Sequence, residues 1–446
     1  MTEILLCTIN KSRQIDYPKH IECHNIGELL KVFYRFFMNP QILQGYGVAL
    51  YTNPVASAAD DDYGQFRATI LHTLGFDAAE KEISGWPGYA STALHALPQL
   101  AKKLGIAALY YKDESTRFGL KSFKALGGAY AVFRLIQKNI AAQHEGHLAT
   151  PEEILSGKYA DIISNMTVTC ATDGNHGRSV AWGAQLFGCR CVIYIHATVS
   201  EGRRAAIAFY GAEVLRIQGN YDDSVHHAAQ QAAEHGWTVV SDTTYEGYRD
   251  IPIDVMHGYG VMSREIVNEL YSNPPTHVLV QAGVGALAAS VCATFWQAWG
   301  AKRPQFVIIE PERADCFFQS GQVGHPVVVT GDLDTVMAGL ACGEVSPVAW
   351  DILKNGINCY ATIADEFALE GMRVFANPHA DDPKIVSGET GSTGLGLLMA
   401  AQGHPLLWNT LGLNANSRVL LIGSEGDTDP TIYKEVVGKT AQEVLA

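Results

Sequence analysis

Short apolar runs alternate with helical patterns along most of this chain. Runs rich in apolar and β-branched side chains occupy residues 108–114, 165–172, 191–196, 213–217, 238–242, 277–281, 306–310 and 418–423. Helical patterns follow several of them, from near Lys121, from about 176 to 187, over 201–210 and over 222–234. Strands buried on both faces of a parallel sheet read as such runs, with helices between them. We therefore expect an α/β protein with doubly wound, mostly parallel sheets.

Glycine-rich turns end several of the predicted strands, and doubly wound sheets bind ligands at those ends. The turn after 277–281 reads Gly283-x-Gly285-x-x-Ala288 and opens a helix. Its backbone N–H groups and the helix N-terminus suit a phosphate. Three interpretations stay open on the residues alone: some other cofactor phosphate, a dinucleotide whose ribose is bound by Glu310, or a tight turn without a ligand.

Two further turns carry polar side chains. Thr172-Asp173-Gly174-Asn175-His176 follows one predicted strand and starts a helix, where an Asp or Asn is often only an N-cap. The polar residues between two glycines exceed what one cap requires, and small residues let a ligand approach the backbone closely. The turn after 418–423 brings Ser424, Glu425 and Asp427 to a sheet edge, either as a hydrogen-bonded turn or as part of a site.

Lys124 is the residue that the pattern explains least, because it follows a charged strand end and enters an apolar, glycine-ended segment. A lysine in such a place either extends its ammonium to solvent or serves a reaction that needs a desolvated amine. The residues alone leave both possibilities open.

Charge and composition narrow the classes of function. The net charge of −14 argues against a general nucleic-acid binder, which needs a basic face. The uncharged stretch 278–299 is interrupted by glycine and glutamine, so we expect no membrane span, and the first residues do not resemble a signal peptide. The 9 cysteines are irregularly spaced without a CxxC pair, which predicts reduced thiols and a cytoplasmic location. No HExxH or other metal-ligand spacing occurs, and we expect no metal.

Several ordered blocks together resemble the fold-type II pyridoxal-phosphate enzymes, the group of tryptophan synthase β and the threonine and serine dehydratases. The blocks are DESTRFGLKSFKALGG, ATDGNHGRSVAWGA, SDTTYEGYRDIP, QAGVGALA, SGETGSTGL and SEGDTDP, in this order between residues 86 and 430. Within the group they look most like the ammonia-lyases of the diaminopropionate type. The resemblance implies a large cofactor-binding domain of residues 1–124 plus 246–446, with an N-terminal extension over 1–85, a smaller α/β domain of 125–245, and a homodimer.

The resemblance also implies roles for individual residues. Lys124 forms the Schiff base with pyridoxal 5'-phosphate, and Asp173 and Asp242 are acids of the catalytic site. The implied cofactor-binding residues are Lys124, Phe123, Asn175, Gly283, Val284, Gly285, Ala286, Leu287 and Ser424, with Asn175 beside the phenolic oxygen and the glycine turn around the phosphate. The implied substrate-binding residues are Thr172, Asp173, Gly174, Asp242, Tyr245, Ser91 and Thr92.

The implied reaction is α,β-elimination from a 2,3-diamino acid, either 2,3-diaminopropionate or an N-substituted relative, to ammonia or an amine and a 2-oxo acid such as pyruvate. Lys124 takes the Cα proton of an L-substrate and Asp173 that of a D-substrate. One alternative is a dehydratase of a β-hydroxy amino acid such as serine, threonine or hydroxyaspartate. A more distant alternative is a nicotinamide-dependent oxidoreductase. Departures from the group's pattern at 90–94 and in the first 85 residues leave the substrate open.

Overall fold

The structure is a computed structural model that describes residues 42–45, 47–172, 174–219 and 221–446. Residues Leu43–Ala446 form one compact unit, to which the description below applies. Much of the predicted N-terminal extension, residues 1–41, lies outside the described residues. Asp173 does so as well.

The larger sheet has the strand order β1-β2-β11-β10-β9-β12-β4-β3 in the described part of the chain. Its strands are β1 (Ile42–Gly45), β2 (Val48–Thr52), β3 (Leu94–Ala96), β4 (Ala108–Asp113), β9 (His277–Gln281), β10 (Gln305–Pro311), β11 (Cys359–Ile363) and β12 (Arg418–Gly423). The five central strands from β11 to β4 are parallel, whereas β2 and β3 pair antiparallel with them. The predicted mostly parallel, doubly wound sheet is confirmed.

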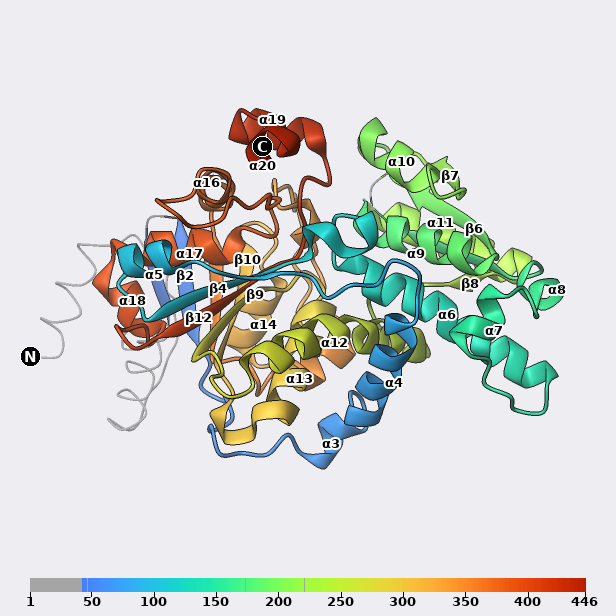
Figure 1. The fold of residues 1–446 in the computed structure, drawn as a ribbon, viewed down its shortest axis with the longest axis horizontal. Helices are drawn as coiled ribbons and strands as arrows, with labels where there is room; N and C mark the ends of the chain where they lie inside the picture. Colours follow the sequence, from blue (N-terminus) through green and yellow to red (C-terminus); the bar gives the residue numbers. More distant parts are fainter. Residues whose placement is uncertain (1–41, 46, 173, 220) are drawn as a thin grey trace, which may run out of the picture. The chain divides into compact units, whose positions relative to one another are not determined.

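Both faces of this sheet are buried. Successive side chains of each central strand point to opposite faces, and they pack in two different hydrophobic cores. Along β9, Val278 and Val280 pack in one core and Leu279 in the other. The helices on the first face are α12 (Asp250–Leu270), α13 (Ala286–Trp299), α14 (Cys316–Val323) and α15 (Pro347–Leu353). Those on the second are α5 (Pro98–Leu104), α16 (Asp365–Ala376), α17 (Thr393–Gln402) and α18 (Pro405–Thr410). Figure 1 shows α12 and α13 across the sheet from α16 and α17.

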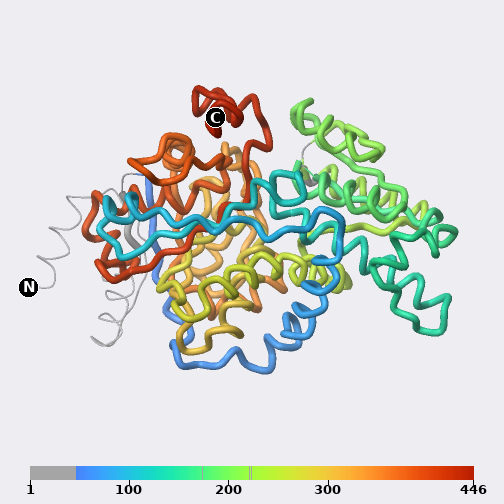
Figure 2. The backbone as a smooth tube through the Cα atoms, viewed as in Figure 1, coloured from blue at the N-terminus to red at the C-terminus, as the bar shows by residue number. Residues whose placement is uncertain are grey.

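The smaller sheet is parallel and has the order β7-β6-β5-β8. Its strands are β5 (Thr167–Ala171), β6 (Arg190–Ile195), β7 (Glu213–Arg216) and β8 (Thr238–Val239). The helices of this part are α6 (Lys124–Gln143), α7 (Pro151–Leu155), α8 (Ala160–Ile163), α9 (Asn175–Phe187), α10 (Glu201–Ala208) and α11 (Tyr221–His235). Figure 2 traces this part of the chain from teal to green. Each sheet thus falls within one of the two predicted domains, although the division itself stays a prediction.

The remaining described elements connect or cap these layers. They are α3 (Gln65–Ala68), α4 (Thr73–Ser84), α19 (Pro430–Val437), α20 (Ala441–Leu445) and the 3-10 turns η1 (Glu114–Gly119), η2 (Gly300–Lys302) and η3 (Ala338–Leu340). No helix among the described residues is both long and apolar enough to cross a bilayer.

The helix predicted from near Lys121 begins three residues later, at Lys124. Phe118 and Lys121 have φ values of 50° and 58°, and this left-handed backbone cannot be part of an α-helix. The consequence for the site is that Lys124 occupies the first position of α6.

Candidate active site

Lys124 is fixed at the carboxyl ends of the central strands by backbone contacts with the segment after β12. Ser122 forms a bridge with Glu425, and the backbone N–H of Phe123 donates to the carbonyl of Ser424 at 3.0 Å. The first residue of α6 therefore lies beside the turn that follows β12, which the resemblance assigns to the cofactor ring.

The ammonium of Lys124 forms an ion pair with the carboxylate of Asp242. The two side chains retain 20% and 14% exposure. Nζ also lies 5.3 Å from the ring centre of Phe123 and 5.8 Å from that of Tyr259. Burial alone would lower the pKa of Lys124, but the charge of Asp242 outweighs it and the pKa is raised.

Asp242 follows β8 by three residues and points to the start of α6 rather than capping the next turn. Burial would raise the pKa of Asp242, yet the charge of Lys124, assisted by His176, holds it well below the ordinary range. Nδ1 of His176 lies 3.8 Å from the Asp242 carboxylate, while Nε2 donates to the carbonyl of Val240 at 2.8 Å. A carboxylate and an amine in contact at a strand edge are groups that can exchange a proton with a bound substrate.

The turn before α9 is organised by Thr172. Its hydroxyl accepts hydrogen bonds from the N–H groups of Gly174 at 3.0 Å and Gly177 at 3.1 Å. The cap of α9 therefore comes from Thr172, because Gly174 at the N-cap position has no side chain. Asn175 is left for other contacts, and it binds Glu425 and Arg178.

The glycine turn after β9 forms the N-terminus of α13. Gly283 and Gly285 have φ values of 55° and 102°, which favour glycine. The first N–H groups of α13, at Ala286 and Leu287, precede any intrahelical acceptor, and with Val284 they border the turn. This uncapped helix start fits a phosphate.

Glu310 does not serve as a ribose-binding acid, in contrast to the dinucleotide interpretation. It is buried and accepts hydrogen bonds from the N–H groups of Phe317 at 2.9 Å and Phe318 at 2.8 Å. Burial raises the pKa of Glu310 to about 8 despite these bonds. Its carboxyl group therefore caps α14, and the feature that favoured a nicotinamide cofactor is absent.

Ser424 is buried at the end of β12, and its hydroxyl accepts a hydrogen bond from Gln281 Nε2 at 2.6 Å. The same amide nitrogen donates to the carbonyl of Ile422 at 3.0 Å. Because Gln281 supplies the donor, the hydroxyl hydrogen of Ser424 remains for another acceptor. An unprotonated pyridine nitrogen is such an acceptor.

Three residues predicted to bind substrate have contacts outside the pair of Lys124 and Asp242, or are exposed. Ser91 is exposed, and Thr92 is buried with its hydroxyl donating to Glu114 Oε1 at 2.5 Å. Tyr245 is 48% exposed and stacks on Tyr248 with the ring centres 4.7 Å apart. Their predicted contacts with substrate stay predictions.

Tyr259 and Glu389 were missed as site residues in the sequence, and Glu425 was named only as a member of a turn that could belong to a site. Tyr259 lies beside Lys124, and its buried hydroxyl has no hydrogen-bond partner within the described part of the chain. Glu389 and Glu425 are buried after α16 and β12. The sequence signal for these two glutamates was their position inside the SGETG and SEGDTDP blocks. Burial of a charged acid costs free energy, so a buried acid there indicates a function.

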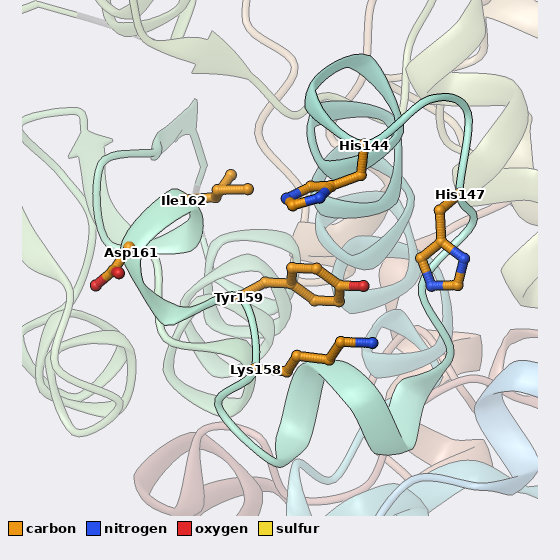
Figure 3. A pocket seen from close by; sticks show the side chains of 6 residues that line it. All are labelled: His144, His147, Lys158, Tyr159, Asp161 and Ile162. Carbon is orange, nitrogen blue, oxygen red and sulfur yellow. The ribbon is translucent and has the colours of Figure 1, made fainter.

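A separate pocket of about 490 Å³ lies at the other end of α6 (Figure 3). It is lined by His144, His147, Lys158, Tyr159, Asp161 and Ile162. His147 and Lys158 both pair with Glu153. Lys124 starts α6 and His144 follows its last residue, so the 20 residues of the helix place this pocket about 30 Å from the start of α6. It is not part of the site.

Lys124, Asn175, the glycine turn and Ser424 match the chemistry that pyridoxal phosphate requires, an amine, a polar amide, a phosphate cradle and a hydroxyl. A profile of the pyridoxal-phosphate dependent enzyme family matches residues 86–405. The chain belongs to this family, and its cofactor is pyridoxal 5'-phosphate.

Among the members of this family, the chain shares high sequence identity with the diaminopropionate ammonia-lyases. The diaminopropionate ammonia-lyase of Escherichia coli K12 is 44% identical over 357 residues, covering 78% of this chain and 88% of the relative. The enzyme of the same name from Salmonella typhimurium is 40% identical over 364 residues, covering 79% and 89%. The crystal structure of the holo E. coli enzyme superposes with a TM-score of 0.78 at 38% identity, covering 89% of this chain and 97% of that one. The expected resemblance and fold are confirmed.

Proposed function

We propose that this chain is a carbon–nitrogen lyase that converts 2,3-diaminopropionate to pyruvate and ammonia by α,β-elimination. The structural observation that carries the proposal is the Asp242 carboxylate in contact with the Lys124 amine, on a chain 44% identical to a diaminopropionate ammonia-lyase. A second carboxylate, Asp173, adjoins this site in the sequence. Because the resemblance assigns both Asp173 and Asp242 to the catalytic site, two acids suit a substrate with two amino groups.

The proposed work of the protein is binding and proton transfer. Pyridoxal phosphate supplies the electron sink that makes the Cα proton of the substrate acidic. Lys124 takes this proton from L-diaminopropionate and Asp173 takes it from the D-isomer, on the opposite face. Asp242 attracts the β-ammonium and orients it for departure, and the backbone N–H groups between Thr172 and Asn175 bind the substrate carboxylate.

The closest alternative is elimination of water from a β-hydroxy amino acid. A solved structure of the E. coli diaminopropionate ammonia-lyase contains D-serine, and it is 38% identical to this chain with a TM-score of 0.79. A hydroxyl group carries no charge for Asp242 to attract, so we expect serine to react more slowly than the diamine.

The test is the rate of pyruvate and ammonia release from D- and L-2,3-diaminopropionate and from D- and L-serine. The proposal predicts a kcat/KM at least 100-fold higher for a diamine than for either serine, which corresponds to about 3 kcal/mol of charge recognition. A preference for serine would instead assign the chain to the dehydratases.

We further propose that the enzyme acts as a homodimer in the cytoplasm, as the resemblance implies. The buried thiols of Cys170 and Cys292 are consistent with a reducing compartment. Sedimentation equilibrium of the purified holoenzyme tests the dimer, and a monomer would contradict it.

A further inference from the structure

The side-chain amide of Asn175 is held at both ends by groups of opposite charge. Its Nδ2 donates to Glu425 Oε2 at 2.5 Å, and its Oδ1 accepts from Arg178 Nη2 at 3.3 Å. A guanidinium can only donate hydrogen bonds and an ionised carboxylate can only accept them. Each partner can therefore bind only one end of the amide, and together they exclude the flipped orientation.

Both partners are themselves fixed. Arg178 is buried, and its Nη2 also donates to the carbonyl of Leu120. Glu425 Oε2 accepts a second hydrogen bond from the Thr428 hydroxyl at 3.1 Å. A Cβ atom on Gly388 would lie 2.9 Å from Glu425 Cγ, so this glycine lets the glutamate pack against the backbone. Each charged group is thus buried and held by a hydrogen bond besides its bond to Asn175.

A second buried acid, Glu389, lies near Glu425. Glu389 is 6% exposed, and its Oε1 has no hydrogen-bond partner within the described residues. Burial and then the charge of Glu425 raise the pKa of Glu389 to about 7, with Arg203 opposing and Asp429 adding to the shift. The charge of one acid therefore acts on the other, and Glu389 holds its proton more tightly than an ordinary carboxyl group does.

We propose that Glu425 is a positioning residue of the cofactor site, which with Arg178 fixes the Asn175 amide so that the second N–H of Nδ2 donates to the phenolic oxygen of pyridoxal phosphate. This inference rests on the placement of Asn175 beside that oxygen, which is part of the proposed function. An amide free to flip would present its carbonyl oxygen to the phenolic oxygen half of the time, and two acceptors repel. Glu425 thus acts through Asn175 without touching the cofactor.

A double-mutant cycle tests this indirect action. We compare Glu425→Gln in the wild-type background and in the Asn175→Ala background, because a glutamine keeps the shape but no longer distinguishes the two amide ends. The readouts are the dissociation constant of pyridoxal phosphate, from titration of the apoenzyme, and the pH midpoint of the visible absorption of the loaded enzyme. Thr428→Val is the matched control, since it removes a donor to the same oxygen but leaves the charge.

The expected result is about tenfold weaker cofactor binding and a shifted pH midpoint for Glu425→Gln, with less than a twofold change in the Asn175→Ala background. Thr428→Val should remain close to wild type in both readouts. If the glutamine variant does not fold, Glu425→Asp replaces it in the cycle, with a smaller loss in the same direction and the same dependence on Asn175.

Two results would overturn the inference: wild-type cofactor binding and pH midpoint in Glu425→Gln, or equal losses with and without Asn175. Neither readout requires a substrate. A failure of the ammonia-lyase assignment would therefore leave these measurements intact, and a failure of the clamp would leave the turnover of diaminopropionate intact.

Discussion

At the scale of single residues, the pair of Lys124 and Asp242 decides the chemistry of the site. Burial would favour a neutral amine, but Asp242 raises the pKa of Lys124 and keeps the proton on it. A nucleophilic amine must be neutral. Attachment of the cofactor therefore requires the amine to lose this proton, and Asp242, whose own pKa is lowered by the ion pair, opposes that loss.

Replacement of Asp242 by asparagine tests that role. Without the carboxylate, burial lowers the pKa of Lys124, so cofactor attachment should extend to lower pH than in the wild type. Turnover of diaminopropionate should fall by about 10²–10⁴-fold, because a proton-transfer group and a contact with the β-ammonium are both lost. Kinetics and visible spectra across pH measure both effects, with Asp161→Asn at the distant pocket as the control. Unchanged kcat/KM would contradict the role of Asp242.

Glu389 provides a prediction for stability against pH. Its folded pKa of about 7 lies above the ordinary value of 4.5, so between these values the folded chain binds more protons than the unfolded chain. Stability from this group is present below about pH 4.5 and is lost as pH rises through 7. Glu389→Gln should be more stable than wild type by about 2–3 kcal/mol at pH 8 and nearly equal at pH 4.5. Denaturant unfolding of the apoenzyme at the two pH values measures this difference, and an equal gain at both would contradict it.

Individual site residues could be predicted from the sequence where several sequence blocks resembled the same family. The blocks singled out Lys124 and Asp242 as residues of one site, and the structure brings these two side chains into contact. The positions of Asn175 and Ser424 were predicted but most of their partners were not. Glu425 reaches Asn175 and Gln281 reaches Ser424 from other turns and strands, and no spacing in the sequence reports these contacts. Arg178 lies on the same helix as Asn175, and its i+3 spacing could have indicated the contact.

At the scale of elements, a buried network ties β4, η1 and α12 together. Glu265 of α12 accepts hydrogen bonds from Lys112 and Arg117, and Arg117 also pairs with Glu114. All four side chains are buried, and their charges cancel. Thr92 joins through its hydroxyl, so the edge strand β3 and the segment leading to Lys124 are held to the helix behind them.

Replacement of Arg117 by methionine should remove more stability than an ordinary substitution. It leaves the carboxylates of Glu114 and Glu265 buried with one cation, which costs about 3–5 kcal/mol. The matched control is Arg190→Met, since Arg190 forms an exposed pair with Glu213 that is worth less than 1 kcal/mol. Urea unfolding of both apoenzyme variants provides the comparison, and similar losses for the two would contradict the importance of the network.

The glycine turn before α13 gives a second prediction at this scale. An alanine at Gly285 would place its Cβ 2.4 Å from Phe317 and 2.9 Å from Ala349, on a backbone with φ of 102°. The turn must shift, and its N–H groups lose the phosphate position. Cofactor affinity should fall at least tenfold in Gly285→Ala, while Gly300→Ala, which has open space beyond α13, should bind normally. Equal affinities would show that the turn does not hold the phosphate.

Most of the parallel strands were predictable because they are apolar runs, which stand out in the sequence. The parallel strand β11 and the strands β1, β2 and β3 at the two edges of the larger sheet were not predicted. Strands β9 and β12 have the predicted bounds. The predicted start of one helix was wrong because the local backbone conformation does not follow the hydrophobic pattern. Lys121 has a left-handed conformation, so α6 begins at Lys124 and not near Lys121. The predicted strand over 238–242 was too long. Strand β8 ends at Val239, so Asp242 lies on the loop that follows it.

At the scale of the whole described unit, the chain passes from the larger sheet to the smaller one and back again. Figure 1 shows the segment from α6 to β8 forming the part with the smaller sheet, before the chain enters α12. Lys124 is the first residue of α6, and Asp242 lies between β8 and α12. The ion pair of Lys124 and Asp242 therefore joins the point where the chain enters the part with the smaller sheet to the point where it leaves that part. This arrangement explains how residues 118 positions apart in the sequence form one site.

The central claim is that this site is organised around a cofactor carried by Lys124. Reduction of the purified holoenzyme with borohydride, followed by peptide mapping, tests it most directly, because reduction fixes the cofactor to the amine that carries it. The account predicts a yellow protein whose visible band disappears on reduction, with the pyridoxyl group on the peptide that contains Lys124. A colourless protein that pyridoxal phosphate cannot reconstitute, or a label on another lysine, would contradict it.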